Sequence, residues 1–133
     1  MKTARIMAVA VLIFGSVFTL HAVRPQLTGI KRTELQRHDL STPGREEVQV
    51  RVDFAPGASV PKHTHPGEEI VYVLEGSLEY QIEDQPLVTL KAGDVFFIPA
   101  ETAHLAKNVG SVDGAEVSTY VVEKGKPLVV LAK

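Results

Sequence analysis

A short stretch in the middle of the chain has residue types and spacing that suit a metal site. His63 and His65 are two positions apart, so on an extended strand both imidazoles leave the same face. The chain then turns, and Glu69 begins the next apolar run, where its carboxylate can return to that face. His104 lies much further along and can supply a fourth ligand. Imidazoles and a carboxylate meeting in this way form a site with nitrogen and oxygen ligands.

Each of these residues also has a purely structural interpretation. His104 alone can be a satisfied core or surface residue, and His63 and His65 can be an exposed pair on a hairpin. Glu68 competes with Glu69 as the carboxylate, although strand alternation favours Glu69.

The ligand set restricts the metal and its chemistry. Neutral imidazoles with one carboxylate suit Fe, Mn, Ni, Cu, Co or Zn, whereas Ca and Mg prefer more oxygens. We therefore expect one divalent transition metal ion of undetermined identity. Positions left open on it can bind water, dioxygen or a chelating substrate. A redox-active metal can activate such a substrate towards oxygen, and a Lewis-acidic metal can polarise a carbonyl.

The surrounding sequence predicts short strands. Apolar residues at 48, 50, 52 and 54 alternate with polar ones, which is typical of a half-buried strand. Further strands are predicted at 70–74, 78–82, 87–90, 95–98, 103–109, 117–122 and 128–131, with turn residues between them. This spacing predicts an all-β antiparallel sandwich or barrel.

With these residues the chain resembles the cupin family, which has two sequence motifs. The first joins a glycine, a His-x-His pair, a glutamate and a second glycine, and it is matched by Gly57, His63, His65, Glu69 and Gly76. The second is matched by Gly93, Pro99, His104 and Asn108, but Glu101 stands where the motif has glycine.

The resemblance implies a single jelly-roll β-barrel that holds one metal through the residues His63, His65, Glu69 and His104. It also implies that Glu69 can act as a catalytic proton acceptor, and that homodimers are possible. The motif glycines would supply positive φ angles. Because Glu101 cannot adopt such an angle cheaply, we expect its turn to have a different geometry.

The N-terminal residues predict that the protein is exported from the cytoplasm. Lys2 and Arg5 precede an uncharged apolar run at 6–20, so residues 1–22 are interpreted as a signal peptide, or alternatively as an uncleaved anchor. Export would place the protein in the periplasm or outside the cell, with membrane contact only if the segment stays uncleaved. Residues 23–44 are polar and are interpreted as an N-terminal arm, followed by the barrel domain at 45–133.

Composition excludes several classes of function. The chain has 14 Lys and Arg against 16 Asp and Glu and no dense basic cluster, so no nucleic-acid partner is expected. The absence of cysteine excludes disulfide scaffolds, zinc–thiolate sites and thiol catalysis.

The function expected from the sequence is an exported metal-binding cupin, specifically a metal-dependent oxidoreductase of dioxygenase type that acts on a small chelating organic substrate. The alternatives are a non-enzymatic module that binds a small ligand or metal, and a Lewis-acid isomerase or lyase, so catalysis itself is left open. Four aromatic residues can either line an apolar cavity or belong to the core, namely Tyr72, Tyr80, Phe96 and Phe97.

Overall fold

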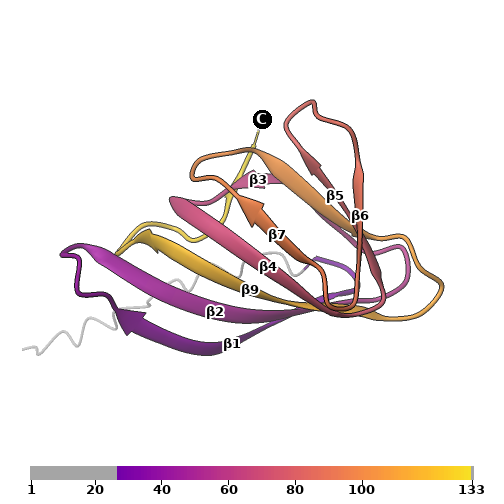
Figure 1. Ribbon diagram of the computed structural model, residues 1–133, viewed down its shortest axis with the longest axis horizontal. Coiled ribbons are helices and arrows are strands. Elements are labelled where there is room, and N and C mark those ends of the chain that lie inside the picture. Colours follow the sequence, from indigo (N-terminus) through magenta and orange to yellow (C-terminus); the bar gives the residue numbers. More distant parts are fainter. Residues whose placement is uncertain (1–26, 133) are drawn as a thin grey trace, which may run out of the picture.

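The computed structural model in Figure 1 describes residues 27–132. These residues form ten strands and no helix, which confirms the all-β prediction. The strands are β1 (Ile30–Asp39), β2 (Arg45–Phe54), β3 (Ser59–Thr64), β4 (Gly67–Glu75), β5 (Ser77–Ile82), β6 (Val88–Lys91), β7 (Val95–Ile98), β8 (His104–Asn108), β9 (Gly114–Glu123) and β10 (Val130–Leu131).

Two five-stranded sheets make up the fold, and all strand pairs are antiparallel. The first sheet has the order β1-β2-β9-β4-β7, and the second has the order β10-β3-β8-β5-β6. Neighbouring strands are often distant in sequence, so the two inner faces combine residues from the whole described chain. Figure 1 shows β1 at the free edge of the first sheet, beside β2.

The hydrophobic core lies between the two inner faces. On β2 the predicted alternation is confirmed, because Val48, Val50, Val52 and Phe54 are buried whereas the residues between them are half-buried. Each such side chain contributes about 1.5–3 kcal/mol when it is removed from water.

The segment expected as an arm contains a strand of the sheet. Within 23–44, the residues Ile30–Asp39 form β1, which pairs with β2 along its whole length. The sequence pattern gave no sign of this because only Ile30 of the strand is buried, as happens at a sheet edge. The turn near Gly44 therefore joins two paired strands and does not separate an arm from the barrel.

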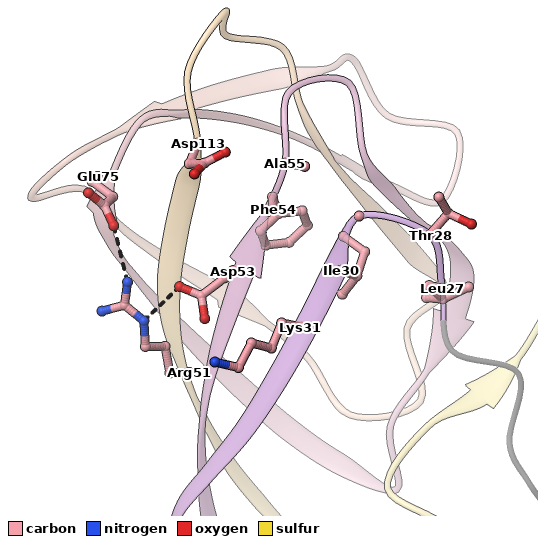
Figure 2. Close-up of a pocket in the computed structure, with 11 residues that line it drawn as sticks. Leu27, Thr28, Ile30, Lys31, Arg51, Asp53, Phe54, Ala55, Glu75 and Asp113 are labelled. Carbon is pink, nitrogen blue, oxygen red and sulfur yellow. Dashed lines mark hydrogen bonds and ion pairs between the residues drawn. The ribbon is translucent and has the colours of Figure 1, made fainter.

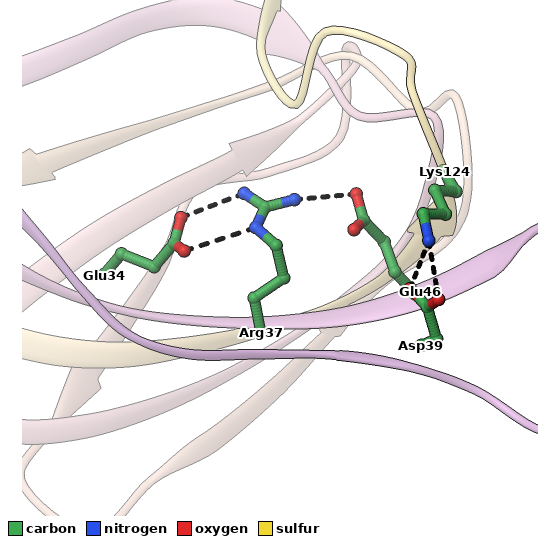
Figure 3. Close-up of polar contacts among 5 residues, drawn as sticks. All are labelled: Glu34, Arg37, Asp39, Glu46 and Lys124. Carbon is green, nitrogen blue, oxygen red and sulfur yellow. Dashed lines mark hydrogen bonds and ion pairs between the residues drawn. The ribbon is translucent and has the colours of Figure 1, made fainter.

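Ion pairs fasten β1 to the rest of the first sheet. Arg37 contacts Glu34 on its own strand at 2.9 Å and Glu46 on β2 at 2.7 Å (Figure 3). Lys124, just beyond β9, binds Asp39 at the end of β1 at 2.6 Å. The exposed pairs add little stability individually, whereas the pair of Arg37 with the buried Glu46 joins β1 to β2.

A β-bulge in β3 brings a histidine into the interior. Val60 pairs with Ala106 and His63 pairs with His104, so β3 has one more residue than β8 between the two pairs. In a regular strand, residues three positions apart, such as Val60 and His63, point to opposite faces, and the extra residue of the bulge removes this mismatch. With it, both side chains are buried on the inner face.

The turns confirm one expectation and overturn another. The motif glycines Gly57, Gly76 and Gly93 have positive φ angles, as expected. Glu101, however, also has a φ of 57°, so the expectation of a different geometry there was wrong. Its backbone N–H donates to the carbonyl of His65, and the turn is closed by a bond from Thr102 N–H. These contacts hold the backbone in a conformation that a glycine would adopt without strain.

The predicted signal peptide or anchor at 1–22 lies outside the described residues. Among residues 27–132 there is no helix long and apolar enough to cross a membrane.

Candidate metal centre

Three histidines converge inside the barrel. His63 at the end of β3 faces His104 at the start of β8, and His65 follows directly after β3. Their ring centroids are 4.3–5.1 Å apart, and their potential ligand atoms all lie within 4.8 Å of one another. All three side chains are buried, so neither an exposed hairpin pair nor a surface histidine describes them.

Backbone carbonyls determine which ring nitrogen of each histidine is free. Nδ1 of His63 donates to the carbonyl of Pro61, that of His65 to Leu128, and that of His104 to Thr102, with distances of 2.5–2.9 Å. Because a carbonyl oxygen only accepts, each Nδ1 must carry a hydrogen. In the neutral imidazole this leaves Nε2 as an unprotonated acceptor, which is the form that binds metals.

Glu69 completes the cluster from the first sheet. Its Oε2 lies 3.1 Å from Nε2 of His65 and 3.1 Å from Nε2 of His104. Glu69 Oε2 and His65 Nε2 are both buried without a well-formed hydrogen bond. Glu69 is fully enclosed on the inner face, whereas Glu68 points to the other side of β4 and is half-buried. Glu69 is thus the carboxylate that reaches the histidines.

The electrostatics of the cluster favour a cation between these acceptors. Burial and the neighbouring His104 lower the pKa of His63 to about 4, so its imidazole is neutral at pH 7. Burial alone would raise the pKa of Glu69, but His104 and His65 beside its carboxylate outweigh this effect and hold the pKa below its ordinary value. A metal ion between these acceptors would supply the positive charge that the carboxylate needs.

A second set of polar groups lines the same small cavity, with Arg32, Glu116 and Tyr120 on the first sheet and Tyr80 on the second. Tyr80 Oη donates to Glu116 Oε2 at 2.5 Å, and Ser118 Oγ donates to the other oxygen at 3.4 Å. Burial, together with the charge of Glu69, raises the pKa of Glu116 to about 8. Arg32 Nη2 donates to Tyr120 Oη at 3.0 Å. The cavity has a volume of about 10 Å³, close to the space of one water molecule.

Arg32, Glu116 and Tyr120 line the cavity but were not predicted from the sequence to do so. On β9 the apolar Val117 and Val121 face outwards, whereas Glu116 and Tyr120 face inwards, so hydrophobic alternation favours the wrong face. The one available signal was the alternation of Glu116, Ser118 and Tyr120 through a predicted strand.

The four aromatic residues have different environments. Tyr80 lines the metal cavity, and Phe96 packs on it with ring centroids 5.5 Å apart. Tyr72 and Phe97 belong neither to this cavity nor to the core, because they are exposed on the outer face of β4 and β7. For Tyr72 both alternatives considered from the sequence were wrong, because the strand register directs it outwards, whereas Phe97 and Phe96 line a separate pocket beside Ile82 and Pro99.

A larger cleft lies at another part of the molecule and has a different character. Its volume is about 700 Å³, and its charged lining residues include Lys31, Arg51, Asp53 and Glu75 (Figure 2). Arg51 contacts Asp53 at 2.7 Å and Glu75 at 3.1 Å; Arg51 and Asp53 are half-buried and Glu75 is exposed. Because these two carboxylates are already paired with Arg51, they do not form a converging ligand set.

Residues 50–123 match the model of the Cupin domain family. The chain belongs to the cupin family. The match spans the whole candidate metal centre, from the His-x-His pair to His104, and it agrees with both motifs identified from the sequence.

Known proteins similar to this cupin include germin-like proteins and an oxidase. Germin-like protein subfamily 2 member 1 of Arabidopsis thaliana is 37% identical over 89 residues, which are 61% of this chain and 41% of the relative. This cupin thus spans less than half the length of that relative. A structure of recombinant oxalate oxidase in complex with glycolate superimposes with a TM-score of 0.64 at 30% identity, covering 80% of this chain and 57% of the other.

A shorter structural relative matches over most of both chains. It is a protein from Klebsiella pneumoniae with a double-stranded β-helix domain, with a TM-score of 0.67 at 26% identity, covering 84% of this chain and 90% of that one. The fold described here is therefore the cupin jelly roll, and its three histidines could hold a metal ion.

Proposed function

We propose that this cupin binds one divalent transition metal through His63, His65, His104 and Glu69. The observation that carries the proposal is the convergence of unprotonated nitrogens and a carboxylate oxygen, including two buried acceptors that lack a hydrogen-bond partner. Acceptors that meet in a buried site repel one another unless a cation lies between them. The Nδ1 bonds to backbone carbonyls hold the three rings in orientation.

We further propose that the protein is a metal-dependent oxidoreductase of dioxygenase type that acts on a small chelating organic substrate. Sequence and structural similarity to a protein named oxalate oxidase, bound to glycolate, supports this choice. The metal would supply open coordination positions and redox chemistry. The chain would contribute ligand orientation, exclusion of bulk water by the buried cavity, and carboxyl groups that can hold a proton, on Glu69 and Glu116.

A non-enzymatic metal- or ligand-binding module is the second candidate. The small volume of the cavity favours it, because about 10 Å³ leaves little room for a substrate beside a metal. Export to the periplasm or outside the cell, and assembly as a homodimer, remain parts of the proposal.

Metal analysis is the first test. The chain, purified without chelators, should contain about one transition metal ion per molecule, and His63→Ala and His104→Ala should lose it. His38→Ala is a matched control, because His38 lies on the exposed face of β1 and is not part of the cluster. Absence of metal in the unaltered chain, or equal metal in all variants, would contradict the site.

Oxygen uptake then separates the two candidate functions. The metal-loaded chain should consume dioxygen in the presence of a small chelating acid or phenol, and His63→Ala should not. If the metal is bound but no such compound supports oxygen uptake, the binding module is the better description. A bound zinc ion with turnover of a carbonyl substrate would instead indicate Lewis-acid chemistry.

A further inference from the structure

Arg32 reaches the metal cavity from the edge strand of the first sheet. The strand register places it on the inner face, because Arg32 pairs with Val52 on β2 and Val52 pairs with Glu116 on β9. Its guanidinium donates to the hydroxyl of Tyr120 at 3.0 Å and lies 6.0 Å from the centre of that ring. Tyr120 in turn packs against His65, with ring centroids 4.7 Å apart. Arg32 is thus separated from a histidine of the metal centre by one side chain.

Exposure distinguishes Arg32 from the other residues around the cavity. Of the ten described residues that line it, nine are buried and only Arg32 is exposed. With Arg32 in place the cavity has space for about one water molecule. A larger ligand can therefore reach the centre most easily where the long, flexible Arg32 side chain swings away.

The charge at this place favours an anion. Arg32 is the one lysine or arginine among the described residues that line the cavity, and its guanidinium is always protonated. Even with Glu69 and Glu116 both ionised, a divalent metal and one guanidinium leave a net positive charge in the cavity.

We propose that Arg32 admits and selects a small carboxylate ligand at the metal centre. When the ligand binds, the guanidinium releases its hydrogen bond to the hydroxyl of Tyr120 and donates to the carboxylate instead. Both groups accept hydrogen bonds, but a carboxylate can accept two from the guanidinium and carries a full negative charge. In the free protein Tyr120 positions the side chain of Arg32. This inference rests on the proposed metal function, and it specifies the chemical class of the substrate.

The test compares a charged and an uncharged ligand of equal size. The full chain is loaded with Co²⁺, its metal content is measured, and glycolate or its neutral amide, glycolamide, is titrated by calorimetry while the Co²⁺ absorption spectrum is followed. The variants are Arg32→Gln, Arg32→Lys and Lys31→Gln. Lys31→Gln is the matched control, because it removes the same charge from the neighbouring residue, which faces the cleft of Figure 2.

We expect Arg32→Gln to bind glycolate at least about tenfold more weakly, because a charge-assisted pair is lost. Glycolamide binding should stay unchanged, Lys31→Gln should behave as the unaltered chain, and Arg32→Lys should be intermediate. Equal glycolate binding in Arg32→Gln and the unaltered chain would overturn the inference, as would an equal loss of both ligands. Failure of the Co²⁺-loaded unaltered chain to bind glycolate would overturn it while leaving the metal site intact. Failure to bind Co²⁺ at all would overturn the proposed function as well.

Discussion

The metal cavity and the cleft of Figure 2 both contain carboxylates and basic groups, but they arrange them differently. In the cleft, Arg51 lies between Asp53 and Glu75, and each of these three charges has an opposite charge beside it. In the metal cavity, His65 Nε2 and Glu69 Oε2 face each other as buried acceptors without a partner. The cleft is far larger, at about 700 Å³ against about 10 Å³.

The volume of a pocket is therefore a poor guide to the candidate functional site in this molecule. An exposed ion pair is satisfied by its partner and by water, so it gains little from a further ligand. Buried acceptors that converge have no water to hydrogen-bond with. A cation that binds between them therefore provides the favourable electrostatic interactions that they otherwise lack. The following predictions test this contrast.

The largest expected effect is metal-dependent stability. Zinc added to metal-free protein at about 1,000 times its dissociation constant should stabilise the fold by about 4 kcal/mol, because it binds the folded state. Thermal unfolding should show this gain in the unaltered chain and in Arg51→Gln. His63→Ala should lose it, and an equal gain in His63→Ala would place the zinc at some other part of the molecule.

The pH dependence of stability should report the buried carboxyl of Glu116. Burial raises its pKa to about 8, so the folded protein keeps a proton that the unfolded chain releases at lower pH. Between about pH 5 and 8 the metal-free protein should therefore lose up to about 1.4 kcal/mol per pH unit relative to Glu116→Gln.

Denaturant unfolding of both metal-free proteins at several pH values measures this difference. The effect of His63 has the opposite sign, since its lowered pKa removes stability as pH falls from its ordinary value towards 4, but it is common to both proteins. Glu75→Gln in the exposed cleft should follow the unaltered chain. Parallel curves for the unaltered chain and Glu116→Gln would show that Glu116 is ionised in the folded state.

A smaller effect is expected at the turn that contacts His65. Glu101 has a φ of 57°, a conformation that costs a residue with a side chain about 1–2 kcal/mol. Glu101→Gly should relieve this strain and raise the free energy of unfolding by up to about 1 kcal/mol, after allowing for the greater freedom of glycine in the unfolded chain. Glu101→Ala is the control, because alanine meets the same backbone strain. A gain of equal size in Glu101→Ala would assign the effect to the side-chain charge.

The smallest effect is expected in the cleft. Arg51→Gln removes two exposed ion pairs, and the melting temperature should stay within the error of the measurement, since hydrated pairs contribute little. A marked destabilisation, measured by thermal unfolding beside the unaltered chain, would mean that the contrast between cleft and cavity is weaker than the geometry indicates.

The residues that converge in the cavity were predictable from strand alternation and motif spacing. Strand alternation favoured Glu69 over Glu68, and the motif spacing identified His63, His65 and His104. The sequence could not indicate that a bulge in β3 is needed to turn His63 inwards, since a bulge depends on how β3 pairs with β8.

Strands at the edge and strands with a polar inner face were harder to predict. The strand β1 has one buried residue, so its apolar pattern was too weak to distinguish it from an arm. On β9 the inner positions include Glu116, Ser118 and Tyr120 while Val117 and Val121 face outwards, which obscures the usual pattern. For Glu101, a positive φ angle is unfavourable, as the sequence indicated. The tertiary contacts that nevertheless impose this angle could not be predicted from the sequence.

The sequence by itself determined the all-β class, the motifs and the histidines and glutamate that converge in the cavity, because alternation and motif spacing act over a few neighbouring residues. Only the tertiary structure decided that Arg32, Tyr120 and Glu116 surround the same cavity. Those three residues meet through the register of β1, β2 and β9, and register joins segments that are far apart along the chain. The tertiary structure also decided which buried polar atoms lack a hydrogen-bond partner, because the partners of a buried group can come from any strand that packs around it.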